Sequence, residues 1–339
     1  MVALVFLAAC RNVGDDVETA VGSTSLPTLP LPTATSLPEV PITDEPVSQP
    51  TQQEAPTATP LPSTPTPLPS DPEFDGANAF TYLEAQMALG PRWPGSPGHL
   101  QLRHYIQDTL VQSGWAVTEQ SFDYQGFTAV NLIAKANEGQ GPVIILGAHY
   151  DTRRLADQTP DAGDKPVPGA VDGGSGIAVL LELARTLDLE ETNHEVWLAF
   201  FDVEDNGHGG LPGWDYIAGS TYMANNLTIN PEAVVVVDMV GQVEQELYFE
   251  GNSNQGLRLI LWRIAADLGY GEHFIQEQKY TMIDDHLPFA QRGVSAVDII
   301  DFDYAYWHTT EDTLDKVSPA SLEQVGRTLE YWLEDYLDN

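Results

Sequence analysis

The chain has 339 residues, of which 42% are hydrophobic, so it is long and apolar enough to bury a substantial core. Fifty acidic side chains against 14 basic ones give a formal net charge of -36 at pH 7. This balance leaves no basic surface to neutralise phosphates and argues against a nucleic-acid partner, while it favours a self-repelling surface or the attraction of cations.

The N-terminal segment ends at the single cysteine of the chain, Cys10. Cys10 closes the run Leu7-Ala8-Ala9-Cys10 directly after an apolar stretch, and this resembles the lipobox of bacterial lipoprotein precursors. The resemblance implies that residues 1–10 are a signal segment, that Cys10 is lipidated, and that the protein is an exported cell-envelope lipoprotein or extracellular. The lipid at Cys10 would be its only contact with a membrane. No basic residue precedes the short apolar run, so a degenerate signal peptide with an accidental cysteine is the alternative.

Residues 11–72 are rich in Pro, Thr and Ser. Fourteen of the 25 prolines fall between Pro27 and Pro72. Such a segment cannot bury enough apolar surface to offset its ordering entropy, which predicts a disordered, extended linker. The linker would hold a catalytic domain, residues 73–339, away from a membrane.

The rest of the chain alternates apolar runs with amphipathic segments. Several apolar runs are continuous, as expected for strands buried on both faces. The alternation predicts one α/β domain with a mostly parallel central sheet and helices on both faces, in which ligands bind beyond the carboxyl ends of the strands. We expect strands at 116–124, 128–134, 143–147, 195–201, 233–237 and 296–300, and helices at 81–89, 100–112, 175–187, 220–225, 257–268 and 319–337.

Polar residues follow the ends of these predicted strands. Taken singly, each has an ordinary explanation, such as a loop residue or a helix N-cap. Taken together at one sheet edge, two histidines and several carboxylates form a nitrogen and oxygen ligand set suited to Zn²⁺. Asp151 can accept the second imidazole N–H of His149 and fix its tautomer. The residues are His149, Asp151, Asp172, Glu204, Asp205, Asp238 and His308.

This ordered set resembles metallopeptidase family 28, the co-catalytic zinc aminopeptidases, to which the animal-type glutaminyl cyclases also belong. The resemblance extends from about Phe80 to Leu337. It implies a zinc aminopeptidase-like fold and one or two zinc ions. His149 and Asp238 would bind one ion, Asp205 and His308 the other, with Asp172 as the bridge and Glu204 as the general base or acid. Asp205 stands where a second Glu is common in the family.

Two activities on peptide or protein N-termini remain open. The motifs Pro94-Gly95-Ser96-Pro97-Gly98 and Asp284-Asp285-His286-Leu287-Pro288-Phe289, with Trp307 before His308, resemble the cyclases, which turn N-terminal glutamine into pyroglutamate. This implies that Asp284 and Asp238 join a hydrogen-bond network around Glu204, and that Trp307 walls the substrate pocket. Trp307 as a core aromatic and Asp284 as a helix cap are the plainer interpretations. An aminopeptidase is the alternative, and an inactive peptide-binding module the remote one.

Overall fold

A computed structural model describes residues 74–190 and 192–337. The predicted signal segment, the lipidation of Cys10 and the linker at 11–72 lie outside these residues. Within the described residues, no helix combines the length and the apolar composition needed to cross a membrane.

The central sheet has six strands in the order β1-β2-β4-β3-β5-β8. The inner strands β4 (Glu195–Phe201), β3 (Val143–His149), β5 (Ala233–Asp238) and β8 (Ser295–Ile300) are parallel. At the edge, β1 (Ala116–Tyr124) and β2 (Phe127–Ala136) form an antiparallel hairpin, and β2 pairs antiparallel with β4. The two-residue turn Gln125-Gly126 has positive φ at both positions, as such hairpins require. The prediction of a mostly parallel sheet is confirmed.

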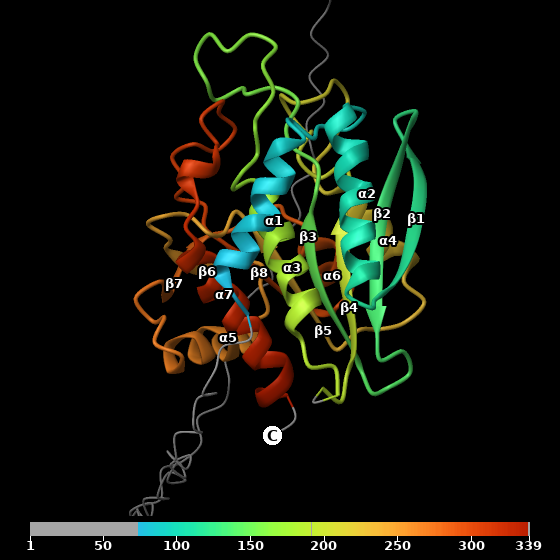
Figure 1. Cartoon of the computed structure of the whole chain (residues 1–339), viewed down its shortest axis with the longest axis vertical. Helices are drawn as coiled ribbons and strands as arrows, with labels where there is room; N and C mark the ends of the chain where they lie inside the picture. Colours follow the sequence, from blue (N-terminus) through green and yellow to red (C-terminus); the bar gives the residue numbers. More distant parts are fainter. Residues whose placement is uncertain (1–73, 191, 338–339) are drawn as a thin grey trace, which may run out of the picture. The chain divides into compact units, whose positions relative to one another are not determined.

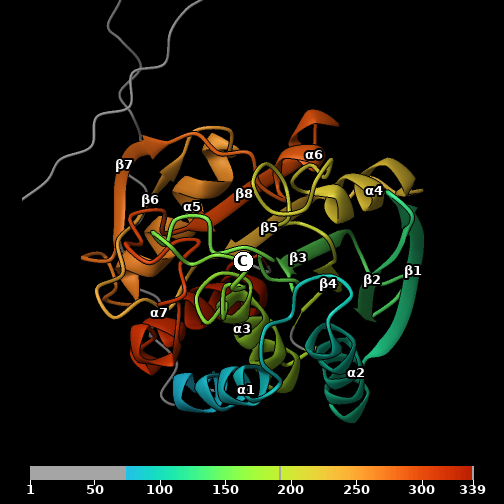
Figure 2. The same ribbon diagram turned by 90° about the horizontal axis from the view of Figure 1, so that it is seen from above.

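Helices cover both faces of the sheet (Figure 2). One face packs against α1 (Gly76–Ala88), α2 (Pro97–Gln112), α3 (Gly174–Thr186) and α7 (Pro319–Tyr331), and the other against α4 (Ala218–Asn226) and α6 (Leu287–Gln291). Alternate strand residues supply the two cores: Leu146 faces the first cluster and Ile145 the second. A sheet buried on both faces explains why its strands read as continuous apolar runs.

A small parallel sheet of β6 (Leu247–Glu250) and β7 (Phe274–Tyr280) was not expected from the sequence. The first strand has only four residues, and the second exposes most of its length, so neither carries a clear apolar period. Helix α5 (Gln255–Asp267) connects the two strands (Figure 1). The small sheet matters for the site because the chain leaves β7 directly into residues 281–284.

Some helix ends also differ from the prediction. Helix α1 begins at Gly76, five residues before the expected start, because the Asp75 side chain accepts hydrogen bonds from the N–H groups of Ala77 and Asn78. Helix α7 ends at Tyr331, and a π-helical turn, Trp332–Tyr336, follows it.

Candidate metal centre and active site

The polar residues singled out from the sequence meet at one edge of the sheet. His149 is the last residue of β3 and Asp238 the last of β5, and Glu204 and Asp205 follow β4. Because these strands are parallel, their carboxyl ends lie at the same edge. Asp172 precedes α3 and His308 lies in the loop after β8. The expected convergence of these side chains is therefore what the fold produces.

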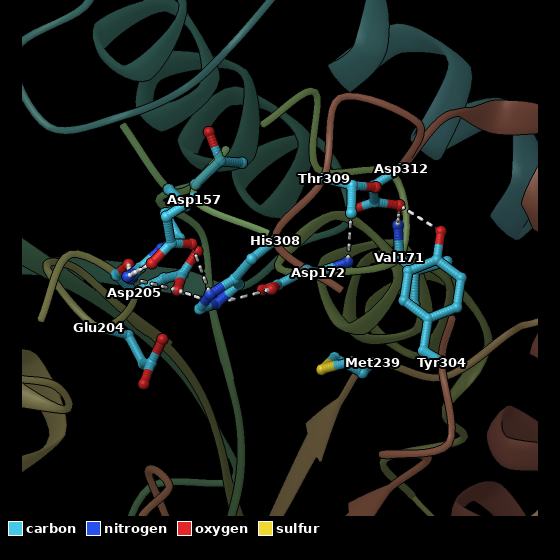
Figure 3. Close-up of polar contacts among 12 residues, drawn as sticks. Asp157, Val171, Asp172, Glu204, Asp205, Met239, Tyr304, His308, Thr309 and Asp312 are labelled. Atoms are coloured by element: carbon cyan, nitrogen blue, oxygen red, sulfur yellow. Dashed lines mark hydrogen bonds and ion pairs between the residues drawn. The ribbon is translucent and has the colours of Figure 1, made fainter. Parts of the chain in front are cut away.

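The side chains form two groups that share Asp172, each with its ligand-type atoms within 4.8 Å of one another. In the first, Nε2 of His149 lies 3.1 Å from Oδ1 of Asp238 and 3.3 Å from Oδ1 of Asp172. In the second, Nε2 of His308 lies 3.0 Å from Oδ1 of Asp205 and 3.7 Å from Oδ2 of Asp172 (Figure 3). Asp172 thus presents one oxygen to each group, the arrangement of a bridging carboxylate.

The donor set fits a zinc ion. All five side chains are buried, and imidazole nitrogens and carboxylate oxygens are the atoms that Zn²⁺ prefers together with thiolates. Oδ2 of Asp205 has no hydrogen-bond partner among the described residues, although it is buried. A buried acceptor of this kind needs a proton donor or a cation.

The electrostatics of the two histidines also favour a positive charge at this edge. Burial alone would lower the pKa of His149, but Asp238, with Asp151 and Asp172, raises the pKa well above its usual value. Burial also opposes protonation of His308, and its carboxylate neighbours, Asp205 foremost, raise its pKa to about 9. The carboxylates therefore attract a proton or a metal ion to the same place.

A glycine permits the close approach of the Asp172 turn to His149. Gly173 has φ +82°, and a Cβ there would lie 3.0 Å from Cε1 of His149 and 2.8 Å from the main-chain oxygen of Asp151. Both the backbone conformation and the space at this position exclude an ordinary side chain.

Glu204 is placed by a strained turn. The preceding residue, Val203, is β-branched and buried, yet it has φ 55°, a conformation that such residues rarely adopt. The main-chain oxygens of Val203 and Glu204 accept hydrogen bonds from Ala218 and Ile217. These bonds hold the turn, which directs Glu204 into a cavity beside the two ligand groups.

The surroundings of Glu204 suit a residue that exchanges a proton. Burial raises the pKa of Glu204 well above its usual value, and the neighbouring charges of Asp205, Asp285 and Asp284 add to the rise against the opposing effect of His149. A carboxyl group tuned upward in this way can act as both base and acid near neutral pH.

The predicted role of the Asp151 side chain is wrong in its detail. Its Oδ1 lies 3.8 Å from Nδ1 of His149, whereas the main-chain oxygen of Asp151 lies only 3.0 Å from that nitrogen and faces it instead. The carboxylate of Asp151 accepts hydrogen bonds from the N–H groups of Glu204 and Asp205 and from the Asn206 side chain. Asp151 therefore orients the histidine through its backbone and the next loop through its side chain.

Asp284 borders the same cavity without a hydrogen bond to Glu204. Within the described part of the chain, neither Asp284 nor Asp238 bonds to Glu204, so the expected hydrogen-bond network is not present in this form. A charge on Asp284 would add to the rise in the pKa of Glu204, after the larger effects of burial and of Asp205 and Asp285. Its carboxylate does not cap α6, since His286 occupies the N-cap position and only the main-chain oxygen of Asp284 receives the Leu287 N–H.

Trp307 lines the cavity and packs, partly buried, against the edge of the main core. Its ring stacks on His308, with 3.7 Å between the ring centroids, and meets the edge of Phe302. The cavity has a volume of about 270 Å³ and combines an acidic floor with apolar walls. Besides the predicted residues, Tyr216, Met239, Thr281, Met282, Ile283, Ile300 and Phe302 line it.

Sequence reasoning missed Asp312, which holds the shared ligand. The carboxylate of Asp312 accepts hydrogen bonds from the N–H groups of Val171 (2.8 Å) and Asp172 (3.2 Å) and from the hydroxyl of Tyr304 (2.7 Å) (Figure 3). Asp312 follows no strand end, and the sequence pattern offered no signal for it.

The fold and the site together define an α/β protein whose sheet edge carries two groups of metal-ligand-type side chains beside a cavity. Comparison with known proteins makes this more specific: the pattern of Peptidase family M28 matches residues 131–333, and the chain belongs to that family.

Glutaminyl cyclases and an aminopeptidase both occur among the similar proteins. The glutaminyl-peptide cyclotransferase of Bothrops jararaca is 27% identical, covering 73% of this chain and 78% of that protein. The crystal structure of Porphyromonas gingivalis glutaminyl cyclase has a TM-score of 0.74 and 32% identity, covering 78% of this chain and all of that one (100%). A leucine aminopeptidase precursor from Bacteroides thetaiotaomicron has a TM-score of 0.73 and 31% identity, covering 78% of this chain and 98% of that one.

Proposed function

We propose that this protein is a zinc-dependent glutaminyl-peptide cyclotransferase, which converts N-terminal glutamine into pyroglutamate and releases ammonia. The observation that carries the proposal is the cavity of about 270 Å³ in which Glu204, Asp284 and Trp307 lie together beside the ligand groups. Its size suits one small side chain, and its acids suit an α-amine. The similarity to glutaminyl cyclases supports the same activity.

The metal-binding residues would be His149, Asp172 and Asp238 for one zinc ion, and Asp172, Asp205 and His308 for another, so one or two ions can be held. Zinc, when bound, polarises the γ-carboxamide carbonyl of the substrate as a Lewis acid.

The protein's own residues then move one proton. Glu204 accepts a proton from the neutral α-amine as the amine nitrogen bonds to the γ-carboxamide carbon. The bond from that carbon to the amide nitrogen breaks, and Glu204 returns the proton to the departing nitrogen, which leaves as ammonia. Because the nucleophile belongs to the substrate, the enzyme mainly orients the two ends, and the flat Trp307 ring limits the conformations of the side chain.

An aminopeptidase is the second candidate, favoured by one observation. His149 keeps a complete ligand group with Asp172 and Asp238, as a two-zinc peptidase requires. In that reaction Glu204 would take the proton from a water molecule, which would attack the first peptide bond.

Two peptides that differ only in the first residue distinguish the candidates. With N-terminal glutamine, a cyclotransferase releases ammonia and leaves the peptide about 17 mass units lighter, with no residue removed. With N-terminal leucine it does nothing, because leucine has no carboxamide. Removal of leucine, or of glutamine without ring closure, would instead establish the aminopeptidase.

We further propose that the protein is exported and held at the bacterial cell envelope by a lipid on Cys10. The lipobox-like sequence supports this proposal. A Cys10→Ser variant should shift from the membrane fraction to the soluble fraction, and continued membrane association would contradict the anchor.

A further inference from the structure

The carboxylate of Asp157, which is not one of the expected ligands, faces the Nδ1 side of the His308 ring. Oδ1 of Asp157 lies 3.3 Å from Nδ1 of His308, while Nε2 on the other side of the ring faces Asp205 and Asp172 (Figure 3). An imidazole whose Nδ1–H faces a carboxylate keeps its lone pair on Nε2. The contact therefore favours the tautomer that can bind a metal ion through Nε2.

Asp157 is itself fixed by Arg153. Nε of Arg153 donates to Oδ1 of Asp157 at 3.0 Å, and Nη2 donates to Oδ2 at 2.8 Å. The Arg153 side chain is fully buried, whereas that of Asp157 is 29% exposed. A bidentate pair of this kind fixes direction as well as distance, so Asp157 presents one defined oxygen to His308.

The same guanidinium group also holds the segment that carries Asp205. Nη1 of Arg153 donates to the main-chain oxygen of Asp205 at 2.8 Å, and Nη2 donates to that of His208 at 2.6 Å. One side chain thus connects the loops of both ligands in the second group, Asp205 directly and His308 through Asp157.

The backbone around this contact is tightly constrained. His308 has φ 56°, a conformation that a non-glycine residue keeps only when its surroundings enforce it. The Gln158 N–H donates to the main-chain oxygen of His308, and the Thr310 N–H donates to the Thr159 hydroxyl. At Gly209, which has φ +92°, a Cβ would lie 2.5 Å from Oδ2 of Asp157, so the covering loop also fits closely.

We propose that Asp157 is the positioning residue of His308, and that Arg153 makes His308 and Asp205 one structural unit. The proposal rests on the zinc site of the proposed function. In the first ligand group, Nδ1 of His149 meets a main-chain oxygen at 3.0 Å, and the carboxylates of Asp151 and Glu204 lie farther away, at 3.8 and 3.9 Å. Zinc binding by the second group therefore depends on Asp157.

The test is the zinc dissociation constant, measured by competition with a chelator for the wild type, D157A and D157N. Loss of a carboxylate that orients a metal-binding histidine weakens metal binding about 10–100-fold, which we expect for D157A. D157N should bind with intermediate affinity, because its amide oxygen can still face the Nδ1–H of His308 while its NH₂ group faces Arg153. D157N also preserves the shape of the side chain, so it carries the test if D157A does not fold.

The matched control is E182Q, which disrupts another arginine–carboxylate pair, Arg185–Glu182 on α3, with contacts at 2.9 and 2.6 Å. E182Q should lower the melting temperature and leave zinc affinity unchanged. The proposal is overturned if D157A binds zinc within threefold of the wild type, if D157N is as weak as D157A, or if E182Q weakens binding equally. A wild type that binds no zinc would refute the proposed zinc site, whereas a zinc-binding wild type unaffected at Asp157 refutes only the positioning role.

Discussion

The two ligand groups reach the same sheet edge by different physical means. His149 and Asp238 end neighbouring parallel strands, and the register that pairs Gly147 with Val236 brings them side by side two residues later. Asp205 and His308 lie in loops, where the buried Arg153 and the partly exposed Asp157 contact them. We call the first pair strand-placed and the second loop-held. Strand-placed ligands depend on the sheet, whereas loop-held ligands depend on a few hydrogen bonds.

Glu204 lies next to a ligand of each pair, and we expect its substitution to have the largest effect on activity. Its Oε2 lies 3.9 Å from Nδ1 of the strand-placed His149, and it precedes the loop-held Asp205. E204Q removes the proton carrier and keeps both ligand groups, so we expect activity to fall about 10²–10⁴-fold with zinc content unchanged. Parallel measurements of turnover and zinc per chain check this. A loss below tenfold would exclude Glu204 from proton transfer.

Removal of a ligand from each group tests the comparison directly. D205A and H308A remove loop-held ligands, and H149A removes a strand-placed one. We expect D205A and H308A to lose metal along with activity, and to lose more zinc than H149A, because the unpartnered Oδ2 of Asp205 marks the second group as the one that needs a cation. The zinc content of each purified variant is measured by metal analysis. Asp164 is exposed, so Asp164→Ala serves as the control. Equal losses of zinc in D205A, H308A and H149A would contradict the distinction between strand-placed and loop-held ligands.

The distinction also explains how much the sequence could reveal. The inner strands and the residues at their ends were predictable, because a buried parallel sheet needs apolar runs and puts its carboxyl ends at one edge. The residues that hold the loops, Asp157 and Asp312, were not, since they act through contacts between segments far apart in the chain. The Asp151 carboxylate was misjudged for the same reason: its partners lie in a loop more than 50 residues away.

Trp307→Ala tests the cavity wall and should have a more modest effect. The ring stacks on the loop-held His308, and aromatic contacts of this kind contribute about 0.5–1.5 kcal/mol, which corresponds to roughly 2- to 13-fold in kcat/KM for a glutamine peptide. Trp214, which does not line this cavity, supplies the control variant Trp214→Ala. Unchanged kinetics for Trp307→Ala would contradict the assignment of the wall even if the cyclase activity is present.

Glu250 holds the loop that carries Asp284, much as Arg153 and Asp157 hold the loops of Asp205 and His308. We expect its substitution to lower the free energy of unfolding. Its carboxylate accepts the Met282 N–H at 2.9 Å and lies 3.1 Å from Nε2 of His286, so it fixes the segment that brings Asp284 to the cavity. Burial alone would raise the pKa of Glu250, but the pairing with His286 and backbone hydrogen bonds lower it to about 2.

Because the pKa of Glu250 is lower in the folded than in the unfolded protein, its contribution to stability is complete above the unfolded value, near 4.5. It is lost as the pH falls toward about 2. Urea unfolding of the wild type and E250Q should differ by roughly 3 kcal/mol at pH 7, and the difference should shrink steadily below about pH 5. The exposed Asp267→Asn should change stability by only about 0–1 kcal/mol. If the difference for E250Q stays constant down to pH 3, ionised Glu250 does not hold this segment, and only the start of α6, where the Leu287 N–H donates to the main-chain oxygen of Asp284, would place Asp284.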